Sequence, residues 1–399
     1  MQALFVSHSG TSPIVCSQGI PHIKELSKRG IYFTFLSFQN RTTKKLSWLI
    51  EEFKQYGIDW RTLNYWRWPF FPASLLDIIR GVFYISWLVR KKRIKVIQSR
   101  SYIPAIMAWG AKKMTGVKFI FDMRGLVPDE QVYCGNWRKS SLKYKGAKYI
   151  ERKLLHSADT IVVVTETFRD YVQNVLSSGL LKNITVIHNC VDTNKFRFDP
   201  LQRNQLRSKL NLQNKFILVY GGSAVEWHLV EEMIDFFVVM KKKLLHSHFL
   251  ILTYEKEKLS KIIYDKGLPQ NDYTLIEAGP QEMPACLSVA DLAISFIKLT
   301  FTKTIAAFPV KFAEYLAVGL PIIINSGIGG TDQLIKTNKL GVIIDGFNDE
   351  NYQKAINAIL DILKEGDDLR RRCREFVQKN LSLEQAVDGY EIIYRSLGK

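Results

Sequence analysis

Short runs of β-branched and aromatic residues alternate with stretches of helical periodicity along the first half of the chain. The apolar runs predict strands, and residues 21–29, between the first two runs, have the spacing of an amphipathic helix. Strands that alternate with helices predict a mostly parallel sheet covered on both faces. The predicted strands of this half are residues 3–7, 31–37, 95–98, 118–121, 160–164 and 185–187.

A second series of strands follows a polar segment that contains Asp199-Pro200. Because proline and short polar residues interrupt regular structure, we predict a linker over residues 196–214. The pattern indicates two Rossmann-like units in tandem, an N-terminal domain over 1–195 and a C-terminal domain over 215–380, followed by a helical segment within 381–399. The predicted strands of the second unit are residues 216–220, 249–252, 273–276, 292–296, 321–324 and 341–344.

The composition is that of a folded protein, with 399 residues, 47% hydrophobic and 24% charged. Five cysteines are far apart in sequence, which favours a reducing, cytosolic compartment. Met1 leads directly into the first predicted strand, so no signal peptide is expected. The apolar stretch 73–89 is interrupted by Asp77 and Arg80, and its uncharged part is too short to span a bilayer.

The positive charge of the chain is confined to its first part. Residues 1–150 contain 25 Lys and Arg against 8 Asp and Glu, a net charge of +17, whereas the remaining 249 residues contain 31 against 30. A basic face can meet nucleic acid, anionic lipid headgroups or phosphorylated substrates, or can serve only to keep the protein soluble.

One segment of the basic part has the composition of a membrane interface. An aromatic and basic cluster at 65–71 precedes the amphipathic stretch 75–89 and the basic run 90–93. Aromatic residues with lysine and arginine suit the headgroup region of a bilayer. The alternative is a helix buried against the sheet with a solvated basic end.

The segment 308–321 carries the strongest chemical signal. Pro309 can begin a helix, and Gly319-Leu-Pro321 can end it. Free N–H groups at such a helix start bind anions, and Lys311 adds a positive charge there. Glu314 lies one turn further on, where its carboxylate can accept the hydroxyl protons of a ribose. The pattern favours a nucleoside diphosphate, although an isolated Lys and Glu three apart are also ordinary on a surface helix.

This segment resembles the signature of retaining glycosyltransferases of the GT-B fold, of the group 1 and family 4 type. It is most similar to the bacterial surface-polysaccharide branch, which reads Ser-Pro-x-Lys-x-x-Glu-Tyr-Leu-Ala-x-Gly-Leu-Pro, with Phe308 here in place of the serine. The resemblance implies an α/β protein of GT-B architecture, in which the sheets of two Rossmann-like domains face each other across a cleft. It implies Glu314 as the ribose ligand. Many relatives carry a second glutamate eight positions earlier, where this chain has Ala306.

Two further segments of the second half are similar to donor-binding loops of the family. Gly221, Gly222 and Ser223 resemble the turn that approaches the donor phosphates in the family. Glycine suits this turn because it lets the backbone come close to the phosphates. Relatives place an arginine and a lysine in this turn, where this chain offers Ser223, Trp227 and His228, and the glycine pair alone is also typical of a plain tight turn. Gly279 and Pro280 match the loop whose backbone contacts the base.

The acceptor side of the resemblance lies in the first half. Arg124 stands where many relatives have a histidine close to the donor sugar, and we expect it to neutralise a leaving or acceptor phosphate. Arg100 is expected on the cleft. Asp129 and Glu130 could orient the acceptor hydroxyl or pair with nearby arginines. Asn189 and Asp192 are expected to fix the interdomain turn, and the closing helix, 381–399, to cross back to the first domain.

The resemblance implies transfer of a sugar from a nucleotide-diphosphate sugar to a saccharide or lipid-linked saccharide with retention of configuration. The implied setting is the biosynthesis of lipopolysaccharide, capsule or exopolysaccharide. Arg124, Lys311 and Glu314 are the expected catalytic residues. The resemblance implies neither a metal nor another cofactor, and the absence of an Asp-x-Asp motif is consistent with a metal-independent reaction. The expected partners are the donor, the acceptor and an anionic membrane surface, on the cytoplasmic side of the cytoplasmic membrane, rather than nucleic acid.

Two other classes of function remain open at this point. The basic first part, with aromatic residues among its arginines, could stack on the bases of a nucleic acid. A relative that binds a sugar nucleotide without turning it over is also consistent with Ala306 and with the altered phosphate turn.

Overall fold

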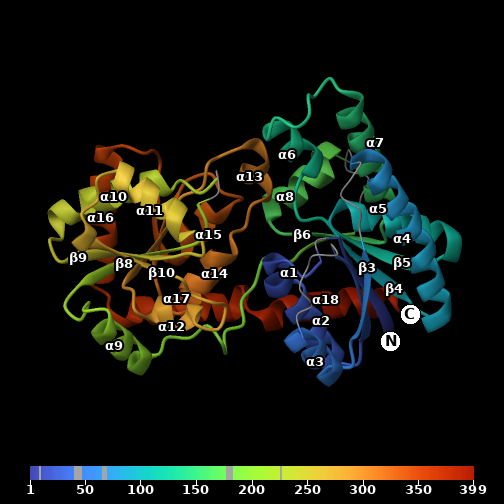
Figure 1. Ribbon diagram of the computed structural model, residues 1–399, viewed down its shortest axis with the longest axis horizontal. Coiled ribbons are helices and arrows are strands. Elements are labelled where there is room, and N and C mark those ends of the chain that lie inside the picture. The colour runs from blue at the N-terminus through green and yellow to red at the C-terminus, as the bar shows by residue number, and fades with distance from the viewer. Residues whose placement is uncertain (9, 40–46, 65–69, 177–182, 225–226) are drawn as a thin grey trace. The chain divides into compact units, whose positions relative to one another are not determined.

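The computed structural model of the protein describes residues 1–399 apart from 9, 40–46, 65–69, 177–182 and 225–226 (Figure 1). The chain forms two compact units. Unit 1 comprises Met1–His188, Ile305–Ala307 and Leu383–Lys399, and unit 2 comprises Asn189–Thr304 and Phe308–Ser382. No helix in the described ranges combines the length and the apolar character that a membrane-spanning segment needs.

Unit 1 is built on a parallel sheet in the order β3-β2-β1-β4-β5-β6-β7. The central strand β1 is buried over almost its whole length, because helices cover both faces of the sheet and leave no solvent side. Its Phe5 is in register with Phe35 of β2 and Gln98 of β4. The strands are β1 (Gln2–Ser7), β2 (Tyr32–Gln39), β3 (Asp59–Asn64), β4 (Val96–Arg100), β5 (Lys118–Asp122), β6 (Thr160–Val163) and β7 (Ile184–Val186).

The helices of unit 1 form two layers, with α4 and α5 on one face of the sheet and α2 and α18 on the other (Figure 1). They are α1 (Pro13–Gln18), α2 (Ile20–Lys28), α3 (Ser47–Gln55), α4 (Phe70–Lys92), α5 (Tyr102–Thr115), α6 (Val127–Tyr133), α7 (Leu142–Ser157), α8 (Glu166–Tyr171), the π-helical turn Val172–Leu176 and α18 (Leu383–Leu397).

The last helix, α18, is part of unit 1 although the chain reaches it only after passing through unit 2. Its buried face includes Tyr394, whose hydroxyl donates to Gln98 Oε1 at 2.7 Å and whose ring meets Phe33 edge-on at 5.4 Å. At the surface, Arg29 of unit 1 pairs with Glu391 at 2.8 Å. Aromatic burial therefore anchors this helix, with the ion pair as a smaller contribution.

Unit 2 contains a second parallel sheet, in the order β10-β9-β8-β11-β12-β13. Figure 1 shows α10, α11 and α16 on one face and α12, α14 and α17 on the other. The core on the first of these faces is mainly aliphatic and contains an aromatic group, in which Phe236 packs edge-on against both Phe296 and Tyr352. The strands are β8 (Phe216–Gly221), β9 (Ser247–Leu252), β10 (Tyr273–Ile276), β11 (Leu292–Ser295), β12 (Ile322–Asn325) and β13 (Gly341–Ile344).

The helices between β7 and α18 are short except for α10, α16 and α17. They are α9 (Pro200–Lys209), α10 (Val230–Lys243), α11 (Lys256–Asp265), the 3-10 turn Gln270–Asp272, α12 (Met283–Ser288), α13 (Phe301–Ala306), α14 (Val310–Ala317), α15 (Thr331–Asn338), α16 (Asp349–Leu363) and α17 (Asp367–Asn380).

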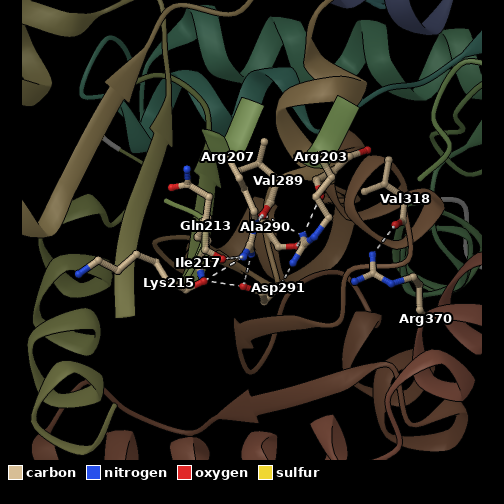
Figure 2. Close-up of polar contacts among 11 residues, drawn as sticks. Arg203, Arg207, Gln213, Lys215, Ile217, Val289, Ala290, Asp291, Val318 and Arg370 are labelled. Atoms are coloured by element: carbon tan, nitrogen blue, oxygen red, sulfur yellow. Dashed lines mark hydrogen bonds and ion pairs between the residues drawn. The ribbon is translucent and has the colours of Figure 1, made fainter. Parts of the chain in front are cut away.

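The segment predicted as a linker, 196–214, contains the helix α9 and belongs to unit 2. Asp199 caps the helix by accepting from Gln202 N at 3.0 Å, and Pro200 occupies the first turn, so the Asp-Pro pair begins a helix here. Figure 2 shows how α9 is held: Arg203 and Arg207 both reach Asp291, at 2.5 and 2.6 Å. The boundary between the units falls after His188 instead of at 195.

The fold predicted from the hydrophobic pattern, two α/β units each with a parallel sheet, is confirmed. Every predicted strand is present within a few residues of its expected place. One edge strand, β3 (Asp59–Asn64), was missed because its side chains are half-buried or exposed and its composition is polar. An edge strand with a partner on one side only does not need an apolar run.

Candidate functional site

The turn after β8 is held by tyrosines on either side of it. Gly221 N donates to the hydroxyl of Tyr315 on α14 at 2.8 Å, and the hydroxyl of Tyr220 donates to Ser223 O at 2.8 Å. Gly222 N donates to Leu252 O at the end of β9. These contacts fix the backbone at the carboxyl end of the sheet, which is where parallel α/β sheets bind their ligands.

Lys311 of α14 places its ammonium group directly beneath this turn. Its Nζ lies 4.9 Å from the centre of the Tyr220 ring, is shielded from solvent, and has no hydrogen-bond partner among the described residues. A Cβ atom added to Gly222 would stand 1.9 Å from this Nζ and 2.6 Å from the Tyr220 hydroxyl. The second glycine is therefore required for the lysine to reach the turn.

The charges of this site are perturbed by burial. Burial lowers the pKa of Lys311 to about 8, and the nearby carboxylate of Glu314 opposes this only in part. Burial likewise raises the pKa of Glu314, against the effect of Lys311 and Lys195. A buried ammonium without a hydrogen-bonded anion is costly, so the site is prepared for a negatively charged ligand.

The start of α14 supplies N–H groups beside this lysine. Pro309 is the N-cap, with an extended backbone, and the helix continues to Ala317. Phe308, which replaces the serine of related sequences, is buried with its ring 5.8 Å from that of Phe312. Asn189 donates to Phe308 O at 2.6 Å. This position thus secures the start of the helix, and Asn189 is bound to it as part of the fold.

The loop after β10 carries the residues predicted to contact the base. Gly279 N donates to Glu282 Oε2 at 2.9 Å, and a Cβ on Gly279 would lie 3.3 Å from the same oxygen. Pro280 is exposed, whereas Ala278 is buried. The loop is closed on itself by Glu282, and the ring of Pro280 is open to solvent.

Sequence reasoning placed His228 in the phosphate turn but gave it no specific role, and the structure places it close to the lysine. Its Nδ1 is buried and has no hydrogen-bond partner among the described residues, and its ring lies 6.1 Å from the Tyr220 ring. Burial lowers the pKa of His228 to about 3, and Lys311 and Lys303 contribute to this lowering. The imidazole is therefore neutral. Only its position, in the turn where relatives carry basic residues, could have signalled it.

Tyr315 is the second residue that sequence reasoning missed. Its hydroxyl bonds the Gly221 backbone, and it is fully buried. The only sequence signal was its place directly after Glu314 in the motif.

In unit 1, Arg124 is engaged with a buried carboxylate. Its Nε lies 2.6 Å from Asp122 Oδ1, and its terminal nitrogen donates to Asp122 Oδ2 at 3.0 Å and to the Tyr390 hydroxyl at 2.8 Å. Asp122 has no exposed surface. Neighbouring His22 is also buried, and burial together with Arg124 and Arg100 lowers its pKa to about 3. Arg124 is thus already paired within unit 1.

Arg100 was expected to face a cleft, but the structure buries it. It is 7% exposed, donates to Gln18 O at 3.1 Å, and lies 3.6 Å from Asp122 Oδ2. Burial lowers its pKa to about 10, an effect that the positive charge of Arg124 increases. Its role in the described structure is to help neutralise Asp122.

The two acidic residues of α6 have different surroundings. Asp129 accepts from the Tyr144 hydroxyl at 2.8 Å and from Lys148 at 3.1 Å, so its partners are a tyrosine and a lysine of α7 rather than arginines. Lys148 also pairs with the buried Glu151. Glu130 Oε1 lies 3.0 Å from where a Cβ on Gly125 would stand. Asp129 therefore joins α6 to α7.

The predicted residues thus fall into two groups, one in each unit. Around the β8 turn, the structure brings together Gly221, Gly222 and Lys311, with Glu314 one turn along α14. Gly279 and Pro280 follow β10 of the same sheet, also at its carboxyl edge. Arg100 is the last residue of β4 and Arg124 follows β5, both strands of the other sheet. Ala306 ends α13 with only a methyl group. Within the described ranges, no group of three His, Cys, Asp or Glu side chains could hold a metal ion.

Known protein families match both halves of the chain. Residues 22–195 match the family model described as Glycosyltransferase Family 4, and residues 202–380 match that described as Glycosyl transferases group 1. A GDP-mannose-dependent alpha-(1-6)-phosphatidylinositol monomannoside mannosyltransferase of Mycobacterium tuberculosis is 21% identical over 224 residues, which are 55% of this chain and 57% of that protein. The match thus spans little more than half of this relative.

Solved structures share the fold over nearly all of their length. A glycosyltransferase from Rickettsia africae ESF-5 has a TM-score of 0.75 at 20% identity, with 100% of this chain and 98% of that chain covered. Anabaena Alr3699/HepE in complex with UDP and glucose has a TM-score of 0.73 at 13% identity, with 99% and 100% covered. With a glycosyltransferase family model over each half and this shared architecture, the chain belongs to the glycosyltransferases of the GT-B fold.

Proposed function

We propose that the protein transfers a sugar from a nucleotide-diphosphate sugar to a saccharide or lipid-linked saccharide acceptor. The observation that carries the proposal is the buried ammonium of Lys311, which has no hydrogen-bond partner among the described residues and lies against the Gly221-Gly222 turn. A diphosphate at this turn would give the ammonium its counter-charge. The N–H groups at the start of α14 would add to the same attraction.

The remaining donor contacts follow from the same sheet edge. Glu314 would accept the ribose hydroxyl protons, for which it must be ionised. A bound nucleotide would bring hydroxyl donors to its carboxylate. Gly279 and Pro280 would meet the base through backbone atoms and a ring face. His228, neutral and with a buried Nδ1 that has no partner in the described ranges, is a further candidate for contact with a phosphate or with the sugar.

Charge stabilisation would supply the catalysis. When the sugar leaves, negative charge grows on the nucleoside diphosphate, and Lys311 and the helix N–H groups are positioned to oppose it without a metal. We expect a smaller contribution from Arg124, because its charge is already paired with that of Asp122. The family resemblance supports retention of configuration, and chelation of divalent metals is expected to leave turnover intact.

The acceptor is proposed to be lipid-linked and the pathway that of a cell-surface polysaccharide. The M. tuberculosis relative is by its description a transferase to a phosphatidylinositol mannoside, which is a membrane lipid. The strongly basic first part of the chain suits an anionic surface. We therefore propose that the protein works on the cytoplasmic face of the membrane as a peripheral protein.

Thermal unfolding in the presence of a panel of nucleoside diphosphates tests donor binding. One of them should raise the melting temperature, since a ligand that binds only the folded state stabilises it. The Glu314→Ala variant should lose this response, and Glu257→Ala, which alters an exposed glutamate of α11, should keep it. A response to oligonucleotides alone would favour a nucleic-acid-binding protein and overturn the proposal.

A non-catalytic binding protein is the second candidate. Ala306 offers no carboxylate to the sugar, and Arg124 is held by Asp122. Release of nucleoside diphosphate from a nucleotide sugar in the presence of a membrane extract would separate the two. Binding without release would favour the non-catalytic candidate.

A further inference from the structure

The outward face of α4 is apolar, unlike that of an ordinary helix on an α/β sheet. Between residues 75 and 91, eight positions are exposed, and five of them are large hydrophobic residues. We call these five the α4 stripe. At 3.6 residues per turn they lie within about 120° of the helix circumference. The stripe consists of Leu75, Leu76, Ile79, Phe83 and Trp87, with exposures of 53%, 59%, 43%, 60% and 47%.

A helix of similar position in unit 2 shows the usual pattern. The exposed positions of α16 (Asp349–Leu363) are acidic, basic, amide or alanine residues, and none is a large hydrophobic residue. Single exposed hydrophobic residues are common in soluble proteins, but a contiguous patch marks a surface that something covers. The α4 stripe is such a patch on the described surface of unit 1.

The charges beside the stripe indicate what covers it. The other three exposed positions between 75 and 91 are Arg80, Arg90 and Lys91, and none is acidic. Arg80 pairs with Asp77 at 3.4 Å, whereas Arg90 and Lys91 have no carboxylate partner among the described residues. The Lys91 ammonium lies 4.5 Å from the centre of the Trp87 ring. Cations beside an exposed aromatic ring match a surface that is apolar inside and anionic at its boundary.

The stripe extends toward the neighbouring helix α5. Arg90 donates to Met114 O at 2.8 Å, and Met114 is 40% exposed. Beside it, the Lys113 ammonium lies 4.2 Å from the centre of the Trp109 ring. Both helices thus have basic residues in their last turn next to exposed apolar side chains, arginine and lysine in α4 and lysine in α5.

We infer that unit 1 docks on an anionic lipid bilayer through the α4 stripe, with Phe83 and Trp87 entering the headgroup boundary and Arg90 and Lys91 contacting lipid phosphates. Because α4 follows β3 and runs back along the sheet, its N-terminal end is at the carboxyl edge, where Arg100 and Arg124 lie. A bound membrane would bring a lipid-linked acceptor to that edge. This last step rests on the proposed function, whereas docking itself does not.

The strength of vesicle binding depends on an electrostatic contribution and an apolar contribution. Each cation near an anionic surface is expected to raise the partition coefficient roughly fivefold at low ionic strength, and this part weakens with added salt. The apolar side chains give a part that salt does not weaken. Binding should thus need both the stripe and anionic lipid.

Flotation of the full-length protein with vesicles tests the inference. Vesicles of phosphatidylcholine mixed with phosphatidylglycerol should carry the wild-type protein, and pure phosphatidylcholine should carry little. The double variant Phe83→Ser, Trp87→Ser should lose at least about tenfold in partition coefficient, on the scale of two exposed aromatic side chains. Arg90→Gln, Lys91→Gln should bind pure phosphatidylcholine as the wild type does and lose the preference for anionic vesicles.

A control variant removes two large hydrophobic side chains that are more exposed and lie elsewhere. The double variant Tyr264→Ser, Ile392→Ser alters residues 84% and 70% exposed on α11 and α18, and should bind vesicles as the wild type does. Nucleoside diphosphate binding should be unchanged in every variant, so that loss of docking is distinct from failure of the donor site.

Three results would overturn the inference. Wild-type protein could fail to float with anionic vesicles, or the Phe83→Ser, Trp87→Ser variant could float as the wild type does. Sedimentation velocity could instead show a dimer that this variant dissociates, and the stripe would then be an interface between two copies of the chain.

Discussion

At the scale of single residues, Lys311 makes donor binding depend on pH. Its pKa is lowered to about 8, whereas burial raises the pKa of Tyr220 and Tyr315 and lowers that of His228 to about 3. Lys311 is therefore the group of this turn that loses charge as the pH rises from neutral through about 8. The affinity for a nucleoside diphosphate should fall as pH rises above about 8, approaching tenfold per pH unit.

Calorimetric titration from neutral pH to about two units above the pKa of Lys311 measures the dependence. The Lys311→Met variant should bind weakly at every pH and show no step near that pKa. A wild-type affinity that stays constant across the whole range would contradict the role given to the ammonium.

The same lysine should lower the stability of the free protein. The pKa of Lys311, about 8, is below the ordinary value of 10.5, so the unfolded chain binds more protons between these two values. The stability cost is complete below about pH 8 and disappears toward pH 10.5. Lys311→Met should therefore raise the free energy of unfolding at neutral pH by on the order of 2 kcal/mol, and by much less near the ordinary pKa of lysine.

Urea denaturation at neutral pH and at a pH near the ordinary pKa of lysine checks this prediction. Lys303→Met, which alters another lysine near His228, is the control and should change stability little. An unchanged or lower stability of Lys311→Met at neutral pH would show that the ammonium is compensated in the free protein.

Sequence reasoning could find Lys311 and Glu314 because both lie on one helix, where spacing fixes their relation. It could not find the contact of Lys311 with Gly222 or that of Tyr315 with Gly221, since these join segments that are far apart in the chain. It also could not tell that Arg124 is paired, because the partner contacts include Tyr390 on the last helix.

At the scale of elements, α9 shows the limit of local signals. Asp-Pro is typical of both a loop and a helix start, and what decides is the pairing of Arg203 and Arg207 with Asp291, which is distant in sequence (Figure 2). Arg203 also donates to three successive carbonyls, of Ser288, Val289 and Ala290, at the end of α12. This helix end is thus satisfied by a side chain of α9.

Asp291 joins α9 to the sheet of unit 2, so its removal should strongly lower the free energy of unfolding. Besides the two arginines, it accepts from Ile217 N at 2.7 Å. Asp291→Ala would leave the buried Arg207 guanidinium without its counter-charge and the N–H of Ile217 without its acceptor. This loss is expected to cost about 3 to 5 kcal/mol of unfolding free energy. Chemical denaturation followed by circular dichroism measures it.

Asp265→Ala is the matched control for that variant, because Asp265 is exposed at the end of α11. The free energy of unfolding of this variant should lie within about 0.5 kcal/mol of that of the wild type. A cost of Asp291→Ala as small as the control's would mean that α9 is held by the carbonyl contacts alone.

At the scale of the whole molecule, the hydrophobic pattern was sufficient for the fold class, because a parallel sheet covered on both faces requires strands that are apolar throughout. The count of charged residues was likewise sufficient to locate the basic part of the chain. Neither could show that the α4 stripe faces outward, since the same apolar residues would suit a helix buried on both sides. Exposure is a property of the tertiary packing, and single-chain patterns leave it open.

The path of the chain makes unit 1 depend on its most distant residues. Removal of 383–399 would expose the surfaces that Tyr390 and Tyr394 cover. Gln98 would lose its hydrogen bond with Tyr394, and Arg124 would lose its hydrogen bond with Tyr390. Both tyrosines are fully buried, and losing either from a core typically costs about 3 to 5 kcal/mol. The truncated protein should therefore keep a folded unit 2 and lose most of the stability of unit 1.

Hydrogen exchange measures this difference segment by segment. Amides of β1 and β4 should lose protection in the truncated protein, whereas those of β8 and β9 should keep theirs, and a nucleoside diphosphate should still bind. The variant Asp388→Ala, Glu391→Ala removes the ion-pair partners of Arg29 and of Arg395. It should leave β1 protected, because exposed ion pairs contribute under about 1 kcal/mol. Full protection of β1 without α18 would show that unit 1 is complete in its N-terminal part, and equal loss in both sheets would show that the two units unfold as one.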